Sequence, residues 1–321
     1  MPQRCPRLAR RLARSRVAAL APLGSPVDVD VRGLTEAEAH DVRQRLQPRR
    51  PTDASQAFPR TRVFALSSGK GGVGKSSLSV NLAIILAQRG HRVAVLDADV
   101  YGFSVPRMIG IGRKPTIVDN LVVPPRAHGV AVVSVALFAD EETPVIWRGP
   151  MLHKMLSQFV VDVHWDEPDL LIVDMPPGTG DVALTLRELV PATEVVVVTT
   201  PQPAAQKVAQ RAAYMARKLD VQVTGVVENM SWFTGNDGVR YELFGAGGGE
   251  LLAQQLDVPL LGQVPLVPAL REGSDRGTPI AVTEPESEAT RAIASVAEAL
   301  LTTRRARMSL PILQGPAQEV T

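Results

Sequence analysis

Short apolar segments alternate with longer segments of mixed polarity from about residue 62 to residue 301. Several short segments, such as LLIV at 170–173 and VVVV at 195–198, are apolar at consecutive positions rather than at every second position. Such runs are typical of strands that are covered on both faces in a parallel sheet. The predicted strands are 62–68, 92–99, 130–136, 169–175, 194–200, 221–229 and 259–265.

The segments between these strands have the length and composition of helices. Ser76 to Gln88 is predicted to be helical, and Gly90 lies just past its end, where a left-handed residue commonly ends a helix. The other predicted helices are 150–162, 181–190, 203–219, 247–256 and 285–303. This alternation predicts an α/β fold with a doubly wound, mostly parallel sheet, helices on both faces and ligand sites beyond the carboxyl ends of the strands.

A glycine-rich loop follows the strand predicted at 62–68. Its sequence GKGGVGKS matches the pattern G-x-x-x-x-G-K-[ST] between a strand and a helix. Glycines let backbone N–H groups close around phosphate oxygens, and the positive end of the following helix favours the anion. We therefore predict an ATP site rather than an ordinary glycine turn of a βα unit. The predicted ATP-binding residues of this P-loop are Gly69, Lys70, Gly71, Gly72, Val73, Gly74, Lys75, Ser76 and Ser77.

The two lysines of this loop have different predicted roles. Lys75 is expected to contact the β- and γ-phosphates, and the Ser76 hydroxyl is expected to bind Mg²⁺. Lys70 directly follows the first glycine and is expected to point away from its own loop. It either contacts the phosphates of a second subunit, as an arginine finger does, or is a solvent-exposed lysine.

Acidic residues lie at the ends of two predicted strands. Asp97 and Asp99 end the strand at 92–99, and Asp174 follows LLIV as a Walker-B aspartate that holds Mg²⁺ does. The next loop, PPGTGD, ends at Asp181 and is predicted to rearrange with the γ-phosphate, which makes Asp181 a switch candidate. Asp97 is the second switch candidate. Each acid alone could instead cap a helix. Their grouping beside the P-loop favours the catalytic interpretation.

Composition excludes several classes of function. The net charge of +2 is too small to indicate a dedicated nucleic-acid binder, and no apolar run reaches the roughly 18–20 residues needed to span a bilayer. The single cysteine, Cys5, excludes an internal disulfide and fits a reducing compartment. We predict a cytoplasmic protein without a membrane or specific nucleic-acid partner, although the arginine-rich start also resembles an organellar transit peptide.

Together, these segments resemble the Mrp/ApbC family of iron–sulfur cluster carrier ATPases, in the MinD/ParA class with a deviant Walker A motif. The resemblance extends from about residue 60 to residue 300. The WRGP and ENMSWF segments favour this family over other members of the class. The segments that carry it are SGKGGVGKSS (68–77), LDADVYGFSVPRMIG (96–110), VIWRGPM (145–151), DMPPGTGDVALTL (174–186), VVTTPQ (197–202), VENMSWF (227–233) and FGAGGGE (244–250).

The resemblance implies a homodimer that binds Mg-ATP between facing subunits and acts with iron–sulfur assembly proteins or apoprotein clients. Lys70 is similar to the signature lysine that crosses the dimer, and Lys75 to the phosphate ligand. Asp99 is similar to the acid that orients the attacking water, and Asp174 to the Walker-B acid. Asn229 resembles the asparagine that recognises adenine. A positioning or regulatory switch ATPase of the MinD/ParA type is the alternative.

One segment departs from the family pattern. In cluster carriers a C-x-x-C pair lies between SWF and the following FG, but this chain has Gly235 and Gly238 at those positions. The tripeptide at 236–238, Asn-Asp-Gly, suits a hairpin turn. Because Cys thiolates hold such clusters, no iron–sulfur ligands are predicted here, and a 4Fe–4S cluster is implied by the resemblance alone.

The resemblance also indicates the domain organisation. Residues 1–46 look like the remnant of a small α/β domain that often precedes the ATPase. Either the chain is truncated here or its start is assigned too far downstream, and we expect residues 1–55 to be poorly packed. Residues 47–60 are predicted to be a linker, 61–303 the P-loop ATPase domain and 304–321 a flexible tail. Pro311 interrupts any membrane-binding helix in that tail.

Overall fold

The chain divides into two compact units, Met1–Arg49 and Arg50–Thr321. The computed structural model describes residues 35–38, 40–41, 54–100, 102–118, 120–138, 149–178, 180–218 and 220–303. In the first unit, Thr35 and Glu38 form a capping box: Glu38 Oε2 accepts from the Thr35 backbone N–H at 2.8 Å, and Thr35 Oγ1 accepts from that of Glu38 at 3.3 Å. Most of the predicted N-terminal remnant and the predicted tail lie outside the described residues.

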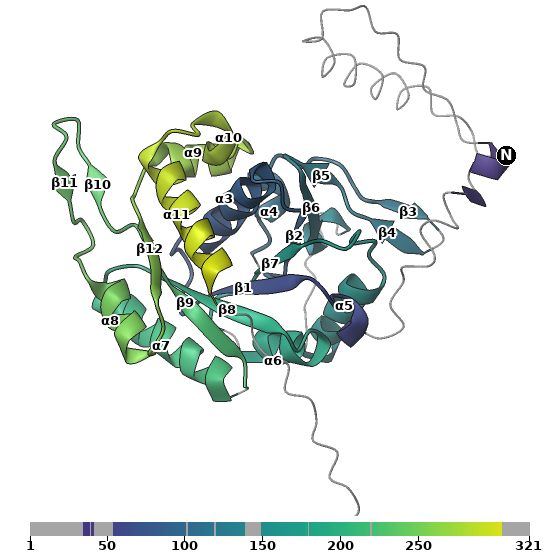
Figure 1. The fold of residues 1–321 in the computed structure, drawn as a ribbon, viewed down its shortest axis with the longest axis horizontal. Coiled ribbons are helices and arrows are strands. Elements are labelled where there is room, and N and C mark those ends of the chain that lie inside the picture. The colour runs from purple at the N-terminus through teal and green to yellow at the C-terminus, as the bar shows by residue number, and fades with distance from the viewer. Residues whose placement is uncertain are drawn as a thin grey trace, which may run out of the picture. The chain divides into compact units, whose positions relative to one another are not determined.

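An eight-stranded sheet forms the centre of the second unit, in the order β12-β9-β8-β1-β7-β2-β6-β5 (Figure 1). Neighbouring strands are parallel except for the edge pair β5–β6. Their bounds are β1 (Arg62–Ser68), β2 (Val93–Asp97), β5 (Arg126–Ala127), β6 (Val130–Ser134), β7 (Leu170–Asp174), β8 (Thr193–Thr199), β9 (Gln222–Asn229) and β12 (Leu260–Val264). The predicted doubly wound sheet is confirmed.

Helices cover both faces of this sheet (Figure 1). On one face lie α3 (Lys75–Gln88), α4 (Val105–Met108), α9 (Pro268–Arg276), α10 (Ile280–Thr283) and α11 (Glu288–Thr302). On the other face lie α5 (Gly149–Val161), α6 (Gly180–Leu189), α7 (Pro203–Lys218) and α8 (Gly248–Gln255). The remaining elements are the 3-10 turns η3 (Ala54–Gln56) and η4 (Val135–Leu137) and the two-stranded pairs β3 (Thr116–Val118) with β4 (Leu121–Val123), and β10 (Phe233–Thr234) with β11 (Arg240–Tyr241).

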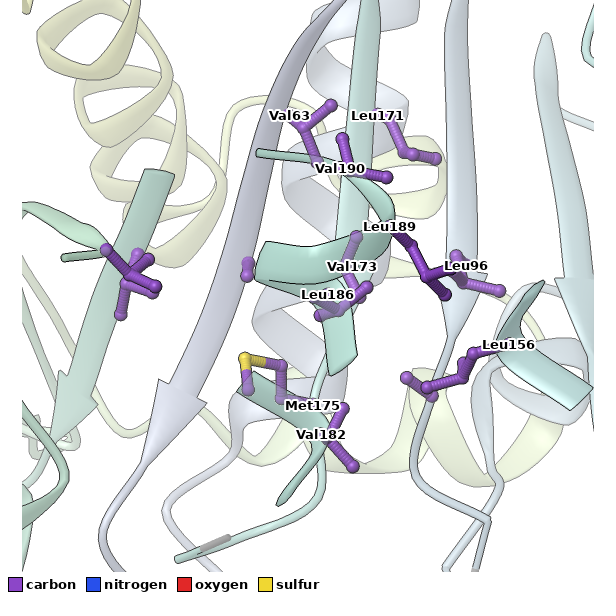
Figure 2. Packing of buried hydrophobic residues seen from close by; sticks show 14 of the residues in the cluster. Val63, Leu96, Leu156, Leu171, Val173, Met175, Val182, Leu186, Leu189 and Val190 are labelled. Carbon is purple, nitrogen blue, oxygen red and sulfur yellow. The ribbon is translucent and has the colours of Figure 1, made fainter. Parts of the chain in front are cut away.

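Side chains of each central strand alternate between two cores. In β1, Val63 and Ala65 pack on the α5–α8 side, whereas Phe64 and Leu66 pack on the α3 side. Figure 2 shows the first of these cores, in which Leu186 and Leu189 of α6 face the sheet. Because both faces are covered, both sets of alternating positions must be apolar, which explains the continuous apolar runs.

The predicted strands and helices are present, with their ends displaced by a few residues. For example, α11 begins at Glu288 rather than at 285, because the Ser287 hydroxyl caps the helix by accepting from the Thr290 backbone N–H at 3.2 Å. The short elements β3, β4, β5, α4, α9, α10 and both 3-10 turns were not predicted. No described helix has the length and apolarity needed to cross a membrane.

Candidate nucleotide site

The glycine loop lies where β1 ends and α3 begins, at the centre of the sheet. Gly72 and Gly74 have φ values of +78°, in the left-handed region that favours glycine. A Cβ atom on Gly69 would overlap the backbone of α7, and one on Gly74 would overlap the Asn229 side chain. Glycine is therefore required at these positions both for the turn and for close packing.

Lys75 and Ser76 converge on the carboxylate of Asp174. Lys75 Nζ donates to Asp174 Oδ1 at 2.7 Å, and Ser76 Oγ donates to Asp174 Oδ2 at 2.6 Å. A further donor is Ser79 Oγ, one helical turn after Lys75 in α3, at 2.8 Å from Asp174 Oδ1. Lys75 and Asp174 are buried, so they form an ion pair shielded from water. The sheet brings this group together because β7, which ends at Asp174, lies directly beside β1.

The loop after Asp174 contacts the glycine loop. The backbone N–H of Gly178 donates to Ser68 O at 2.8 Å, and Gly178 has a φ of +71°. Asp181 follows in the first turn of α6, but its side chain lies outside the described part of the chain. A change in the conformation of the loop at 175–178 would therefore displace the backbone of the glycine loop. The switch role of Asp181 stays a prediction.

Asp97 is buried beside Asp174, because the two residues are register partners on β2 and β7. Its Oδ2 accepts from Ser134 Oγ at 3.0 Å and from the Val105 backbone N–H at 3.3 Å, and its Oδ1 accepts from the Asp99 N–H at 3.2 Å. Burial, aided by the negative charge of Asp174, raises the pKa of Asp97 to about 7 against the opposing effect of these donors. Asp97 therefore anchors the loop that follows β2.

Asp99 lies in that loop, just beyond the end of β2. It is half-buried, and its Oδ1 accepts from the Gly102 backbone N–H at 3.0 Å. Asp99 thus remains partly accessible at the same edge of the sheet as the P-loop, whereas Asp97 is enclosed. This difference agrees with separate roles for the two acids, although the role of each stays a prediction.

Lys70 is held within its own subunit in this structure. It is half-buried, and its Nζ donates to Gln202 Oε1 at 3.2 Å. Gln202 precedes α7 and also accepts from Thr200 Oγ1 at 2.7 Å. The contact of Lys70 with a second subunit stays a prediction.

Ser77, at the end of the P-loop, makes a short contact through its hydroxyl with the Ser274 hydroxyl of α9.

Asn229 ends β9 against the glycine loop. Its Nδ2 donates to Val73 O at 2.8 Å, whereas its Oδ1 is buried and has no partner among the described residues. An orphaned buried acceptor is costly unless a ligand satisfies it, and the amino group of adenine is a suitable donor. Ser76 and Asp174 in turn supply oxygen ligands of the kind that Mg²⁺ prefers. These residues fit the predicted Mg-ATP.

A model of the family described as NUBPL iron-transfer P-loop NTPase, of the ParA type, matches residues 60–301, which include every residue of this site. The chain belongs to this family.

Relatives of this iron-transfer P-loop NTPase carry a consistent name. A protein of Mycobacterium tuberculosis (strain ATCC 25618 / H37Rv) named iron-sulfur cluster carrier protein is 46% identical over 307 residues, which cover 92% of this chain and 81% of the relative. A protein of Bacillus subtilis (strain 168) with the same name is 52% identical over 204 residues, which cover 63% of this chain and 58% of that protein. The recognised resemblance is thus confirmed.

Two solved structures share the fold of this chain. A nucleotide-binding protein of Archaeoglobus fulgidus, solved in complex with ADP, is 32% identical to this P-loop NTPase, with a TM-score of 0.64 over 74% of this chain and 93% of the other. The septum site-determining protein MinD of Pyrococcus horikoshii, 22% identical with a TM-score of 0.55 over 74% and 95% of the two chains, shares the fold.

The segment in place of the C-x-x-C pair is a tight hairpin, as predicted. The Gly235 N–H donates to Val239 O at 2.9 Å, and Gly238 has a φ of +76°. A Cβ on Gly235 would lie 2.6 Å from Asp237 Oδ1 and 2.9 Å from the Tyr241 ring. The described residues contain no group of three or more His, Cys, Asp or Glu side chains that could hold a metal ion. An iron–sulfur cluster does not fit this hairpin.

Polar contacts fasten the hairpin to the start of α11. The Glu288 carboxylate accepts from Trp232 Nε1 at 2.9 Å, Thr234 Oγ1 at 2.9 Å and Arg240 at 3.0 Å. The Arg240 guanidinium also lies over the Trp232 ring, at 4.4 Å from its centroid. We call these contacts of Glu288 with Trp232, Thr234 and Arg240 the clasp. Sequence reasoning missed the clasp, as it missed Ser79, Ser134 and Gln202. Only Ser79 had a clear signal, since it lies four residues after Lys75 on a predicted helix.

Proposed function

We propose that this chain binds Mg-ATP and hydrolyses it slowly, and that the resulting conformational cycle serves iron–sulfur cluster assembly or transfer to apoproteins in the cytoplasm. The observation that carries the proposal is the convergence of Lys75 and Ser76 on Asp174 at the end of β7, beneath a glycine loop. The family match and the names of the relatives support the iron–sulfur context.

The residues of the site have distinct roles in this mechanism. The P-loop backbone and Lys75 bind the phosphates, and Asp174 holds the Lys75 ammonium and the Ser76 hydroxyl in place. Bound Mg²⁺ would be held by Ser76 and Asp174 and would neutralise phosphate charge. Asp99 orients the attacking water, and Asn229 accepts from the adenine amino group through its free Oδ1.

A homodimer completes the site. Lys70 leaves Gln202 and adds its charge to the phosphates held by the other subunit, in the manner of an arginine finger. The different partners of the two lysines support this arrangement, because Lys75 is already bound to the Asp174 carboxylate whereas Lys70 is bound to the neutral Gln202 side chain.

We propose that partner proteins, and not this chain, bind the iron–sulfur cluster. The hairpin has no thiolate at positions 235 and 238, and its turn is shaped around glycine. The chain therefore acts on an assembly protein or apoprotein client instead of carrying a cluster between two hairpins. Anaerobic reconstitution with iron and sulfide should leave no visible chromophore after desalting. A chromophore that survives desalting would contradict this division of labour.

Calorimetry tests the nucleotide site. We expect Mg-ATP to bind the wild-type chain and the Lys207→Ala control, because Lys207 is exposed on α7. Lys75→Ala should weaken binding by about a hundredfold, since charge-assisted hydrogen bonds to the phosphates are lost. Absence of Mg-ATP binding by the wild-type chain would overturn the proposal. Sedimentation with DNA or liposomes in the presence of ATP tests the positioning-ATPase alternative.

A further inference from the structure

A cavity of about 830 Å³ lies between α4, η4 and the end of α9, away from the P-loop residues. This volume is in the range of sites that hold small ligands or short peptide segments. The buried part of its lining is apolar and includes Pro106, Ile111 and Leu137. The exposed part includes four basic side chains, those of Arg107, Arg113, Lys114 and Arg276, together with Phe103, Gly110 and Gly112. None of the described lining residues is acidic, so we call it the basic cavity.

Among the described residues, Arg276 is the only one of the three arginines of the basic cavity that pairs with a carboxylate. Arg276 pairs with Glu272 at 3.5 Å, and Arg113 donates to Arg126 O at 3.5 Å. The Arg107 guanidinium has no hydrogen-bonded or ionic partner among the described residues. Since each guanidinium carries five N–H donors, the exposed lining retains donors for carboxylates.

The shape of the cavity selects among anionic ligands. Gly110 and Gly277 are packed backbone to backbone, and the Gly110 N–H already donates to Arg107 O at 3.1 Å, so this loop forms no phosphate-binding nest like that of the P-loop. A nucleic-acid backbone calls for an extended basic stripe rather than an apolar hollow, and the net charge of +2 is small. A peptide that carries both carboxylates and an apolar side chain matches both parts of the lining.

Asp97 connects two walls of the basic cavity to the nucleotide site. Its Oδ2 accepts from the Val105 N–H at the start of α4 and from Ser134 Oγ. Ser134 Oγ in turn accepts from the Ala136 N–H at 3.2 Å and so caps η4. Asp97 is also the register partner of Asp174. A change of charge at Asp174 therefore acts on the carboxylate that fastens both α4 and η4.

We propose that the basic cavity binds an acidic, apolar segment of a partner protein and that its affinity for this segment depends on the bound nucleotide. The inference rests on the proposed function, for which it supplies the partner-binding surface. By linkage, a segment that binds more tightly in one nucleotide state also changes the affinity for that nucleotide by the same factor.

Fluorescence anisotropy with the full chain tests the peptide site. The probe is a fluorescein-labelled peptide of alternating Glu and Leu, compared with one of alternating Gln and Leu and one of alternating Glu and Ser. We expect the Glu–Leu peptide to bind most tightly and Arg107→Gln/Arg113→Gln to weaken its binding about tenfold. The control Arg211→Gln/Arg291→Gln makes the same charge change at exposed sites on α7 and α11 and should bind as the wild type does.

Equal binding of the Glu–Leu and Gln–Leu peptides, or equal losses in the two double variants, would overturn the proposal. Binding of a DNA duplex that is lost in Arg107→Gln/Arg113→Gln, without peptide binding, would also overturn it. ATP affinity of the same samples is measured by calorimetry. Because Arg107 and Arg113 lie outside the nucleotide site, that affinity should be unchanged, so failure of the peptide site is distinguishable from failure of ATP binding.

Peptide titrations with Mg-ATP, with Mg-ADP and without nucleotide test the coupling. We expect the affinities to differ by about fivefold or more between nucleotide states. Ser134→Ala removes the link between Asp97 and η4 and should reduce this difference, whereas Ser295→Ala, at an exposed position of α11, should leave it intact. The same affinity in all three states, or an unchanged difference in Ser134→Ala, would disprove the coupling.

Discussion

At the scale of single residues, the site depends on the buried ion pair between Lys75 and Asp174. Three side-chain donors, from Lys75, Ser76 and Ser79, converge on that one carboxylate. Removing its charge leaves a buried ammonium without a counter-ion, which is costlier than losing an exposed pair. The pair therefore links the stability of the fold to the chemistry of the site.

Asp174→Asn should lower the free energy of unfolding by about 3 kcal/mol, because it leaves the buried charge of Lys75 without a counter-ion. Urea denaturation without nucleotide measures this loss. Asp275→Asn is the matched control, since Asp275 forms an exposed pair with Arg271 and its loss should cost less than about 1 kcal/mol. Equal losses in the two variants would contradict a shielded pair.

The raised pKa of Asp97 predicts a pH-dependent stability. The folded-state pKa of about 7 lies above 3.8, the ordinary value for an aspartate, so the folded chain binds the extra proton between these values. Stability should therefore fall as the pH rises from about 4 to about 7, by on the order of 2–4 kcal/mol. Asp97→Asn should flatten this slope in urea titrations that contain EDTA. An identical slope in the variant would show that Asp97 does not titrate in this range.

At the scale of elements, the sequence predicted the central fold because its signals were long and regular. The seven predicted strands make up the sheet together with β5, and their signal was clear because covered strands must be apolar on both faces. The short β5 and α10 carry too few residues to show a period. P-loop positions were predictable from spacing, whereas the Lys70–Gln202 and Asp97–Ser134 contacts join strand ends far apart in sequence and depend on strand order.

The hairpin of β10 and β11 owes its placement to Glu288. Burial raises the pKa of Glu288, but hydrogen bonds from Thr234 and Trp232 and the charge of Arg240 outweigh this effect and lower it overall. The clasp therefore contributes stability above the ordinary pKa of glutamate, and this contribution is lost as the pH falls through the lowered value.

Glu288→Gln should lower the free energy of opening the hairpin by about 1–2 kcal/mol, because a charged hydrogen-bond acceptor is replaced by a neutral group. Hydrogen exchange of residues 233–241 at neutral pH measures the change. Glu298→Gln on the same helix removes a charge paired with Arg89 at an exposed site, so it should leave hairpin exchange unaltered. Unchanged exchange in Glu288→Gln would mean that backbone hydrogen bonds alone hold the hairpin.

At the scale of the whole molecule, the proposed dimer makes each active site a composite of two chains. Lys70→Ala and Asp99→Asn should each abolish ATP hydrolysis while retaining ATP binding. When the two variants are mixed, heterodimers contain one site with an intact Lys70 and Asp99, provided that Lys70 acts across the interface. About a quarter of wild-type hydrolysis should then return, because half the dimers are mixed and half their sites are intact.

The control for this experiment is Lys70→Ala mixed with Lys70→Ala/Asp99→Asn, in which no intact site can form. An inactive mixture of the two single variants, with mixed dimers demonstrated by mass spectrometry, would place Lys70 in its own subunit.

The left-handed turn at Gly238 has an evolutionary consequence. Two residue substitutions would place cysteines at both positions, but each replacement meets a barrier: a left-handed backbone at position 238 and a crowded Cβ position at 235. A thiol pair at these positions would therefore require the loop to be rebuilt. The proposed division of labour, in which partner proteins bind the cluster, would be hard to reverse by point substitution.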